Sequence, residues 1–189
     1  NETDILSAIP YKPNRVALHR DPSFMPCRRA AWAAWNYLSS SAALIESSRI
    51  IGNHARFNAS GVSVLEGTPT LAGNRFEQNT TRVGGGLYMK NAATVAIRNL
   101  FVANRADEHG GGLAVCNAAP FIAGNVLFRN SASEHGGGIY CYGDWGHCHA
   151  SLINNTAALN SAAQGGGLAG DRDVTLTVTN NLVVDNSSG

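Results

Sequence analysis

Two Glu-His pairs, Glu108-His109 and Glu134-His135, are the residues of this chain best suited to chemistry. Each pair directly precedes a Gly-Gly-Gly run, and the runs that begin at residues 84, 110 and 136 recur every 26 residues. If the repeats stack, Glu108 lies over Glu134 and His109 over His135, with the carboxyl groups about 5 Å apart, as in retaining glycosidases. A like-charge pair at that separation raises the pKa of one carboxyl. The four residues are therefore candidate catalytic residues.

Two other interpretations of these pairs stay open. The stacked histidines, with a glutamate as third ligand, are donors that suit a transition metal. Side chains beside a turn are also typical of a solvated surface ladder that binds nothing. No other residue of the sequence fixes a sugar between the two glutamates, which argues against catalysis. Stacked surface histidines are more often simple ladders than metal sites, so we predict no bound metal and no cofactor.

A second irregular feature runs from Cys141 to His149, within a repeat that is lengthened to 30 residues. Cys141 and Cys148 are close enough in sequence to close a small loop as a disulfide, whereas the segment matches no zinc-ligand spacing. An exposed tryptophan on such a loop would stack on a sugar ring. The candidate carbohydrate-binding residues are the aromatic side chains of this loop and of the segments that follow the glycine runs: Trp145, Tyr142, Tyr140 and Tyr88.

A repeated pair of asparagines, with four residues between its members, indicates how these side chains are positioned. The six pairs are Asn53/Asn58, Asn74/Asn79, Asn99/Asn104, Asn125/Asn130, Asn155/Asn160 and Asn181/Asn186. Asparagine tolerates the left-handed conformation of a sharp bend. Stacked asparagine amides also hydrogen-bond to one another, which satisfies polar groups that would otherwise be buried unpaired. We therefore interpret the twelve asparagines as a structural ladder.

The segments between these asparagines have the period of two expected of β-strands, as in residues 61–65 and 174–178. The strands are short, the turns are rich in Gly and Asn, and the repeats span 21 to 30 residues. This combination predicts an all-β parallel β-helix of about six coils, spaced about 4.8 Å apart. Glycine lacks a Cβ, so the glycine runs are interpreted as turns at which successive coils approach closely.

Two further motifs carry a family resemblance. The Gly-Gly-Gly-Leu/Ile runs, with Phe76-Glu-Gln-Asn79 and Phe101-Val-Ala-Asn104, resemble the Gly-Gly-x-Ile and Phe-x-x-Asn repeats of polymorphic outer-membrane proteins. More broadly, residues 50–189 resemble pectate-lyase-like right-handed parallel β-helix proteins. The resemblance implies a secreted or cell-surface protein with a binding or structural, adhesin-like role and a polysaccharide or glycan partner. The alternative that it implies is a polysaccharide lyase or glycoside hydrolase.

Residues 1–45 differ from the repeats, since they contain no glycine and four of the six prolines. We expect a boundary near residue 45, with an N-terminal segment that caps a repeat domain of residues 46–189. Residues 26–38 are predicted to form a short helix, because Ala and Arg favour helices and Pro is tolerated in the first turn.

Residues 1–38 also resemble an internal piece of bacterial FAD-dependent amine-oxidase-like proteins. The segment that carries this resemblance runs from Ile9-Pro-Tyr-Lys-Pro13 to Ala33-Ala-Trp-Asn-Tyr37. The resemblance implies a third alternative, a fragment of such a protein fused to a β-helix. No strand, Gly-x-Gly-x-x-Gly turn and helix occur in order, so we assign no flavin-contacting residue.

Charge and hydropathy restrict the partners further. The chain has 14 basic and 13 acidic residues, a net charge of +1, which argues against a nucleic-acid partner. No apolar run approaches the roughly 18 residues of a membrane helix, and the N-terminus lacks a signal-peptide pattern. The first residue is Asn and not Met. We therefore expect a fragment or processed form, part of a longer extracellular or cell-surface protein, with no membrane span in this chain.

Overall fold

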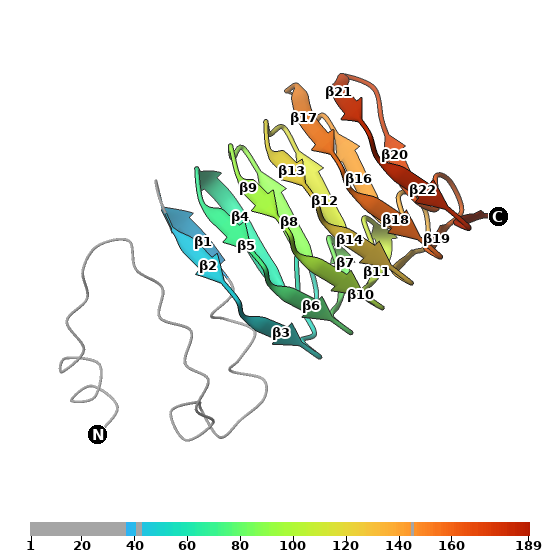
Figure 1. The fold of residues 1–189 in the computed structure, drawn as a ribbon, viewed down its shortest axis with the longest axis horizontal. Coiled ribbons are helices and arrows are strands. Elements are labelled where there is room, and N and C mark those ends of the chain that lie inside the picture. Colours follow the sequence, from blue (N-terminus) through green and yellow to red (C-terminus); the bar gives the residue numbers. More distant parts are fainter. Residues whose placement is uncertain (1–36, 41–42, 145) are drawn as a thin grey trace.

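The computed structural model describes residues 37–40, 43–144 and 146–189, in which every regular element is a β-strand. Short parallel strands follow one another around each coil, and the coils stack along one axis (Figure 1). Three of the four sheets contain six strands and the fourth contains five. The predicted all-β parallel solenoid of about six coils is confirmed.

Each coil contributes one strand to each sheet in the order A, B, C and D, except that the first described coil has no strand in sheet D. Sheet A comprises β1 (Tyr37–Ser40), β4 (Val62–Gly67), β8 (Leu87–Lys90), β12 (Leu113–Cys116), β16 (Ile139–Tyr142) and β20 (Leu168–Gly170). Sheet B comprises β2 (Leu44–Glu46), β5 (Thr70–Ala72), β9 (Val95–Ile97), β13 (Phe121–Ala123), β17 (Cys148–Ile153) and β21 (Val174–Thr179).

The two remaining sheets are built from shorter strands. Sheet C comprises β3 (Arg49–Ile51), β6 (Arg75–Glu77), β10 (Leu100–Val102), β14 (Val126–Phe128), β18 (Thr156–Ala158) and β22 (Leu182–Val184). Sheet D comprises β7 (Thr80–Val83), β11 (Arg105–His109), β15 (Ser131–Ala132), β19 (Ser161–Ala162) and β23 (Ser187–Ser188).

The N-terminal predictions lie mostly outside the described residues. Tyr37 and Leu38, the last two residues of the predicted helix, instead lie in β1, where they pair with Ser63 and Val64 of β4. This end of the helix prediction is wrong, because strand pairing with the next coil overrides local helix propensity. Strand β2 also pairs with the next coil, through β5. The rest of the helix, the cap and the amine-oxidase-like fragment stay predictions.

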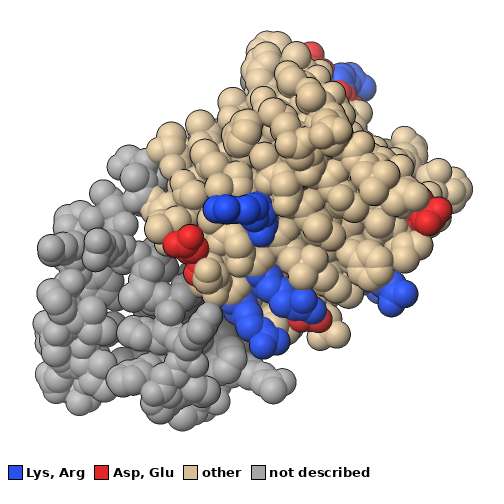
Figure 2. Space-filling model, viewed as in Figure 1, with Lys and Arg blue, Asp and Glu red and all other residues tan. Residues whose placement is uncertain are grey.

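The core is a column of apolar side chains that each coil contributes to the interior. Sheet C shows the pattern most clearly, since the central residue is buried in each of its strands except the last, β22. Phe76 and Phe101 are fully buried in this way, and their rings stack with centroids 4.7 Å apart. Uncharged side chains cover most of the face shown in Figure 2, where basic and acidic groups form small separate clusters. No helix among the described residues is long and apolar enough to cross a membrane.

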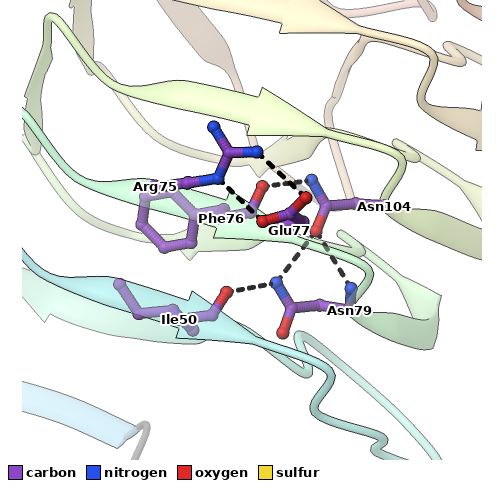
Figure 3. Close-up of polar contacts among 6 residues, drawn as sticks. All are labelled: Ile50, Arg75, Phe76, Glu77, Asn79 and Asn104. Atoms are coloured by element: carbon purple, nitrogen blue, oxygen red, sulfur yellow. Dashed lines mark hydrogen bonds and ion pairs between the residues drawn. The ribbon is translucent and has the colours of Figure 1, made fainter.

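Asparagines form two ladders along this core. The Asn79 side-chain amide donates to the Ile50 carbonyl oxygen at 2.8 Å and to Asn104 Oδ1 at 2.9 Å (Figure 3). The Asn79 backbone N–H donates to the same Asn104 oxygen at 3.1 Å. Successive coils repeat this pattern, and seven of the asparagines in the ladders expose no more than 2% of their surface. The interpretation of the asparagines as structural is confirmed for eleven of the twelve: Asn53, Asn74, Asn79, Asn99, Asn104, Asn125, Asn130, Asn155, Asn160, Asn181 and Asn186.

The exception is Asn58, for which the ladder prediction is wrong. In the first described coil the two ladder positions are Ser48, whose backbone N–H donates to Asn74 Oδ1, and Asn53, which donates to Asn79. Asn58 lies five residues after Asn53, beyond the second ladder position. It is exposed and forms a β-bridge with Val83. The spacing of five residues is the same from 48 to 53 and from 53 to 58, so the sequence alone did not distinguish the two registers.

The glycine runs allow the coils to approach closely, as predicted. The first glycine of each run has a positive φ, for example +67° at Gly110, a conformation that glycine adopts without steric cost. A Cβ on the second glycine, Gly111, would collide with the backbone oxygens of Ser131 and Gly137 in the next coil. The runs thus fix the turn that leads from sheet D to sheet A.

Candidate functional site

The candidate site lies where β11 and the corresponding segment of the next coil lead into the glycine runs. His109 and His135 occupy equivalent positions in adjacent coils and form a parallel bridge. Their rings stack, with centroids 5.0 Å apart and planes inclined by 19°. The same column continues to Val83 in the coil before and Gln164 in the coil after. The predicted alignment of the two histidines is therefore confirmed.

The two glutamates do not converge on one point between them. Glu108 Oε1 lies 2.6 Å from Arg82 Nε, and Glu134 Oε2 lies 3.5 Å from His109 Nε2. Each carboxylate thus contacts a nitrogen of the preceding coil. The Glu134 side chain is the more exposed of the two, at 55% against 29% for Glu108.

His109 is held in an environment that opposes its charge. Burial lowers the pKa of His109 below its ordinary value and exceeds the opposing effect of the Glu134 carboxylate, while His135 lowers the pKa further. The neutral imidazole is therefore favoured near pH 7. Its Nδ1 is buried and has no hydrogen-bond partner, a property it shares among the described side chains only with Thr94 Oγ1. An unpaired buried nitrogen is costly and thus uncommon in proteins.

Tyrosines extend the stack across the outer side of sheet A. The Tyr140 ring lies 4.8 Å from His109 and 5.1 Å from Tyr142, measured between centroids. The hydroxyls of Tyr142 and Tyr88 are 3.2 Å apart. Burial raises the pKa of Tyr140 and that of Tyr88 to about 12, so both phenols stay protonated at neutral pH.

Burial separates the candidate sugar-binding residues into two groups. Tyr88 and Tyr140 expose only 2% and 5% of their surface, so neighbouring protein atoms cover most of their rings. Tyr142 is half-buried, and it is the described member of the set whose side chain stays partly accessible. Trp145 lies outside the described residues, and its role stays a prediction.

The lengthened coil contains the two cysteines expected to pair. Cys141 and Cys148 are both buried and are free thiols in the structure. A hydrogen bond between the two side chains raises the pKa of Cys141 and lowers that of Cys148. Asn117 holds the intervening loop by donating to the Asp144 carbonyl oxygen at 2.6 Å and accepting from the Asp144 N–H at 2.7 Å. The disulfide between these two hydrogen-bonded thiols stays a prediction.

Sequence reasoning missed two contacts of this site. Arg82 precedes its glycine run by two residues, as Glu108 and Glu134 do, so the alignment by glycines would have revealed it. The second contact is made by Asp171, whose carboxylate accepts from the Tyr140 hydroxyl at 3.4 Å. No spacing in the sequence indicates this second contact, because it crosses from β16 to the loop after β20.

Comparisons with known proteins agree with the described geometry. The model of one family, described as right handed beta helix region, matches residues 36–189. Comparisons with curated proteins and with solved structures found no match.

Proposed function

This chain belongs to the right-handed β-helix family, and on that premise we propose that it is a binding or structural solenoid and not an enzyme. The proposed partner is a polysaccharide or glycan. The proposed location is the cell surface or the extracellular space, within a longer surface protein. The proposed glycan partner and the proposed surface location rest on the resemblance of the glycine and Phe-x-x-Asn repeats to those of surface proteins.

The observation that carries the proposal is the pairing of Glu108 with Arg82. A glycosidase needs two carboxyl groups that face the same glycosidic bond, one of them protonated to donate to the leaving group. Glu108 instead forms an ion pair with the Arg82 guanidinium, with its Oε1 2.6 Å from Arg82 Nε, so this carboxylate is already engaged in a contact between coils. The two glutamates therefore act as separate contacts between coils and not as an acid and nucleophile pair.

The surface around Tyr142 is the one best suited to a glycan. Lys90 lies in the same column of sheet A, two coils before Tyr142. Its ammonium lies 3.6 Å from a carboxylate oxygen of Asp144, two residues after Tyr142, and both side chains are partly exposed. An aromatic ring face with adjacent donors and acceptors is the combination that a sugar ring and its hydroxyls need. Tyr88 and Tyr140 support Tyr142 from below, through the hydroxyl contact and the ring stack.

A glycan array with the intact chain tests the binding proposal. For any glycan that binds, Tyr142→Ala is expected to weaken affinity about tenfold or more, as for a buried aromatic anchor. The matched control is Phe121→Ala, which removes an aromatic side chain that is 43% exposed on sheet B. Equal loss in both variants, or none in Tyr142→Ala, would contradict the assigned surface. Absence of binding to every glycan would leave the structural role alone.

The enzyme alternative is tested on the same preparation with a panel of polysaccharides. The lyase or hydrolase alternative retains one favourable observation, the exposed Glu134 carboxylate next to a neutral imidazole. We expect no release of reducing or unsaturated ends. Activity that disappears in both Glu134→Gln and Glu108→Gln would overturn the non-enzymatic proposal.

Two simpler measurements address the remaining expectations. Fractionation of the source cells with an antibody against the chain would separate a surface location from an internal one. An absorbance spectrum of the purified chain would test the amine-oxidase-like fragment, because bound flavin has characteristic visible bands. We expect the antibody signal outside the cell and no flavin bands.

A further inference from the structure

The stacked histidines and one glutamate form a compact group of metal-ligand atoms. One ligand atom from each of His109, His135 and Glu134 lies within 4.8 Å of the other two. The closest measured pair is His109 Nε2 and Glu134 Oε2, at 3.5 Å. Among the described residues, no other group of three or more His, Cys, Asp or Glu side chains comes as close together.

These distances are close to those of a bound ion. Zinc binds imidazole nitrogens and carboxylate oxygens at about 2.0–2.2 Å, which places two ligands of one tetrahedral ion about 3.3 Å apart. The His109–Glu134 contact already has about this separation. The Glu134 side chain is 55% exposed, and among the described residues its one ion pair is that with His109, so its carboxylate is free to adjust. The bridge holds the two backbones side by side, but the rings are stacked with planes inclined by 19°, so the imidazoles must tilt for their in-plane lone pairs to meet at one ion.

Unlike the asparagine ladders, the Glu-His stack does not provide hydrogen-bond partners for all of its own buried polar atoms. In the asparagine ladders every buried side chain has partners in the adjacent coils, whereas His109 Nδ1 is buried and has none. The neighbouring carboxylate, that of Glu108, contacts Arg82 and is not part of this group of three ligands. The column above and below consists of Gln164 and Val83, so the set of three donors occurs once.

We infer that His109, His135 and Glu134 form a binding site for one divalent transition-metal ion of the Zn²⁺, Ni²⁺ or Cu²⁺ class. Two imidazoles favour these ions over Ca²⁺ or Mg²⁺, which prefer all-oxygen sites. Three protein ligands leave a fourth position for water or a ligand on the solvent side, as in open zinc sites. No protein group accepts a hydrogen bond from His109 Nδ1, so the usual support for a ligating histidine is missing and the affinity is expected to be modest.

Titration of the metal-free, tag-free chain with Zn²⁺ by calorimetry, and with Co²⁺ by visible spectroscopy, tests this site. We expect one equivalent of each ion to bind, with the visible bands of Co²⁺ in a nitrogen and oxygen environment. Glu134→Gln and His135→Asn are each expected to weaken binding by more than about tenfold, since even residues that only orient a ligand contribute 10 to 100-fold. Circular dichroism would verify that both variants fold.

His149→Asn is the matched control. It removes an exposed histidine whose ring lies 6.0 Å from that of His147, the other close histidine pair of the described chain. We expect wild-type affinity in this variant. Absence of binding by the wild-type chain, or loss in His149→Asn with wild-type affinity in His135→Asn, would overturn the site. Loss in His135→Asn with no change in Glu134→Gln would overturn the three-ligand arrangement. None of these outcomes depends on whether the chain binds a glycan.

Discussion

Two kinds of polar column run along this solenoid. One kind is the pair of asparagine ladders in its interior, and the other is the Glu-His stack at the turn into sheet A. Both arise from the same geometry, because a residue repeated at equivalent positions of successive coils stacks on its own copy. The interior column is closed, since Asn104 donates to Phe76 and Asn130 and accepts from Asn79. The outer column is open, with an unpaired imidazole nitrogen and an exposed carboxylate.

The difference between the two columns follows from burial. An amide inside the coil has no access to water, so every donor and acceptor must find a partner in the protein. This requirement holds in each coil, and the asparagine column accordingly extends through all of them. At the turn, water satisfies most side chains, so identity varies from Val83 to His109, His135 and Gln164. The variable column is therefore where a specific binding property can arise without loss of the fold.

The largest effect on stability is expected at the glycine runs, because both the asparagine ladders and the Glu-His stack depend on the spacing between coils that these runs allow. Gly111→Ala would place a Cβ against the Ser131 and Gly137 oxygens, so the coils must separate. We expect a loss of more than about 3 kcal/mol in the free energy of unfolding, the upper range for overpacking. The measurement is a urea unfolding curve followed by circular dichroism.

Gly124→Ala is the control for that experiment. Gly124 has a positive φ, of +62°, which Gly111 does not have, and the nearest atom to an added Cβ would be Arg98 Cγ at 3.8 Å. Only the left-handed backbone conformation then opposes alanine, at about 1 kcal/mol. Similar losses in the two variants would show that the contact between coils at Gly111 costs no more than the strained φ at Gly124, which would contradict the importance assigned to that contact.

A smaller loss is expected from opening the closed column at one position. Asn104→Ala leaves the buried Asn79 N–H without its acceptor and removes the donor to Phe76. Unpaired buried groups cost about 1–3 kcal/mol each, so we expect a loss of about 3 kcal/mol. Asn53→Ala keeps the backbone donor to Asn79 and, among the described residues, removes one half-buried side-chain bond, for an expected loss of less than about 1 kcal/mol. Equal losses in a urea unfolding experiment would contradict the role assigned to burial.

The interior column was predictable from sequence because the fold leaves it little freedom. A constant spacing of five residues between asparagines marks two bends separated by one short strand, and this repeats in every coil after the first. The prediction failed only at Asn58, where the first coil has Ser48 in place of the first asparagine. At that position the backbone N–H still reaches Asn74, so the ladder tolerates a residue that the pattern does not contain.

The outer column was predictable only in its backbone register. The glycine runs aligned His109 with His135 correctly, but they gave no information on where the side chains point. Glu108 turns to Arg82, and the rings of the stack lie against Tyr140. These choices depend on rotamers and on burial by the neighbouring sheet, which a repeat pattern does not determine. The chemistry of the site therefore required the structure, whereas the fold did not.

The smallest effect is expected from removing the outer stack itself. His135→Asn loses the ring contacts with His109 and Tyr140, but the backbone bridge is unchanged and water reaches the position. We expect a loss of less than about 1 kcal/mol, as for other partly exposed substitutions. The urea unfolding curve should be measured with a chelator present, so that loss of a bound ion does not add to the difference. A loss as large as that of Asn104→Ala would mean that the histidines are as structural as the asparagines. The open nitrogen would then be a cost of packing, and the distinction between the two columns would no longer support a binding site at the turn.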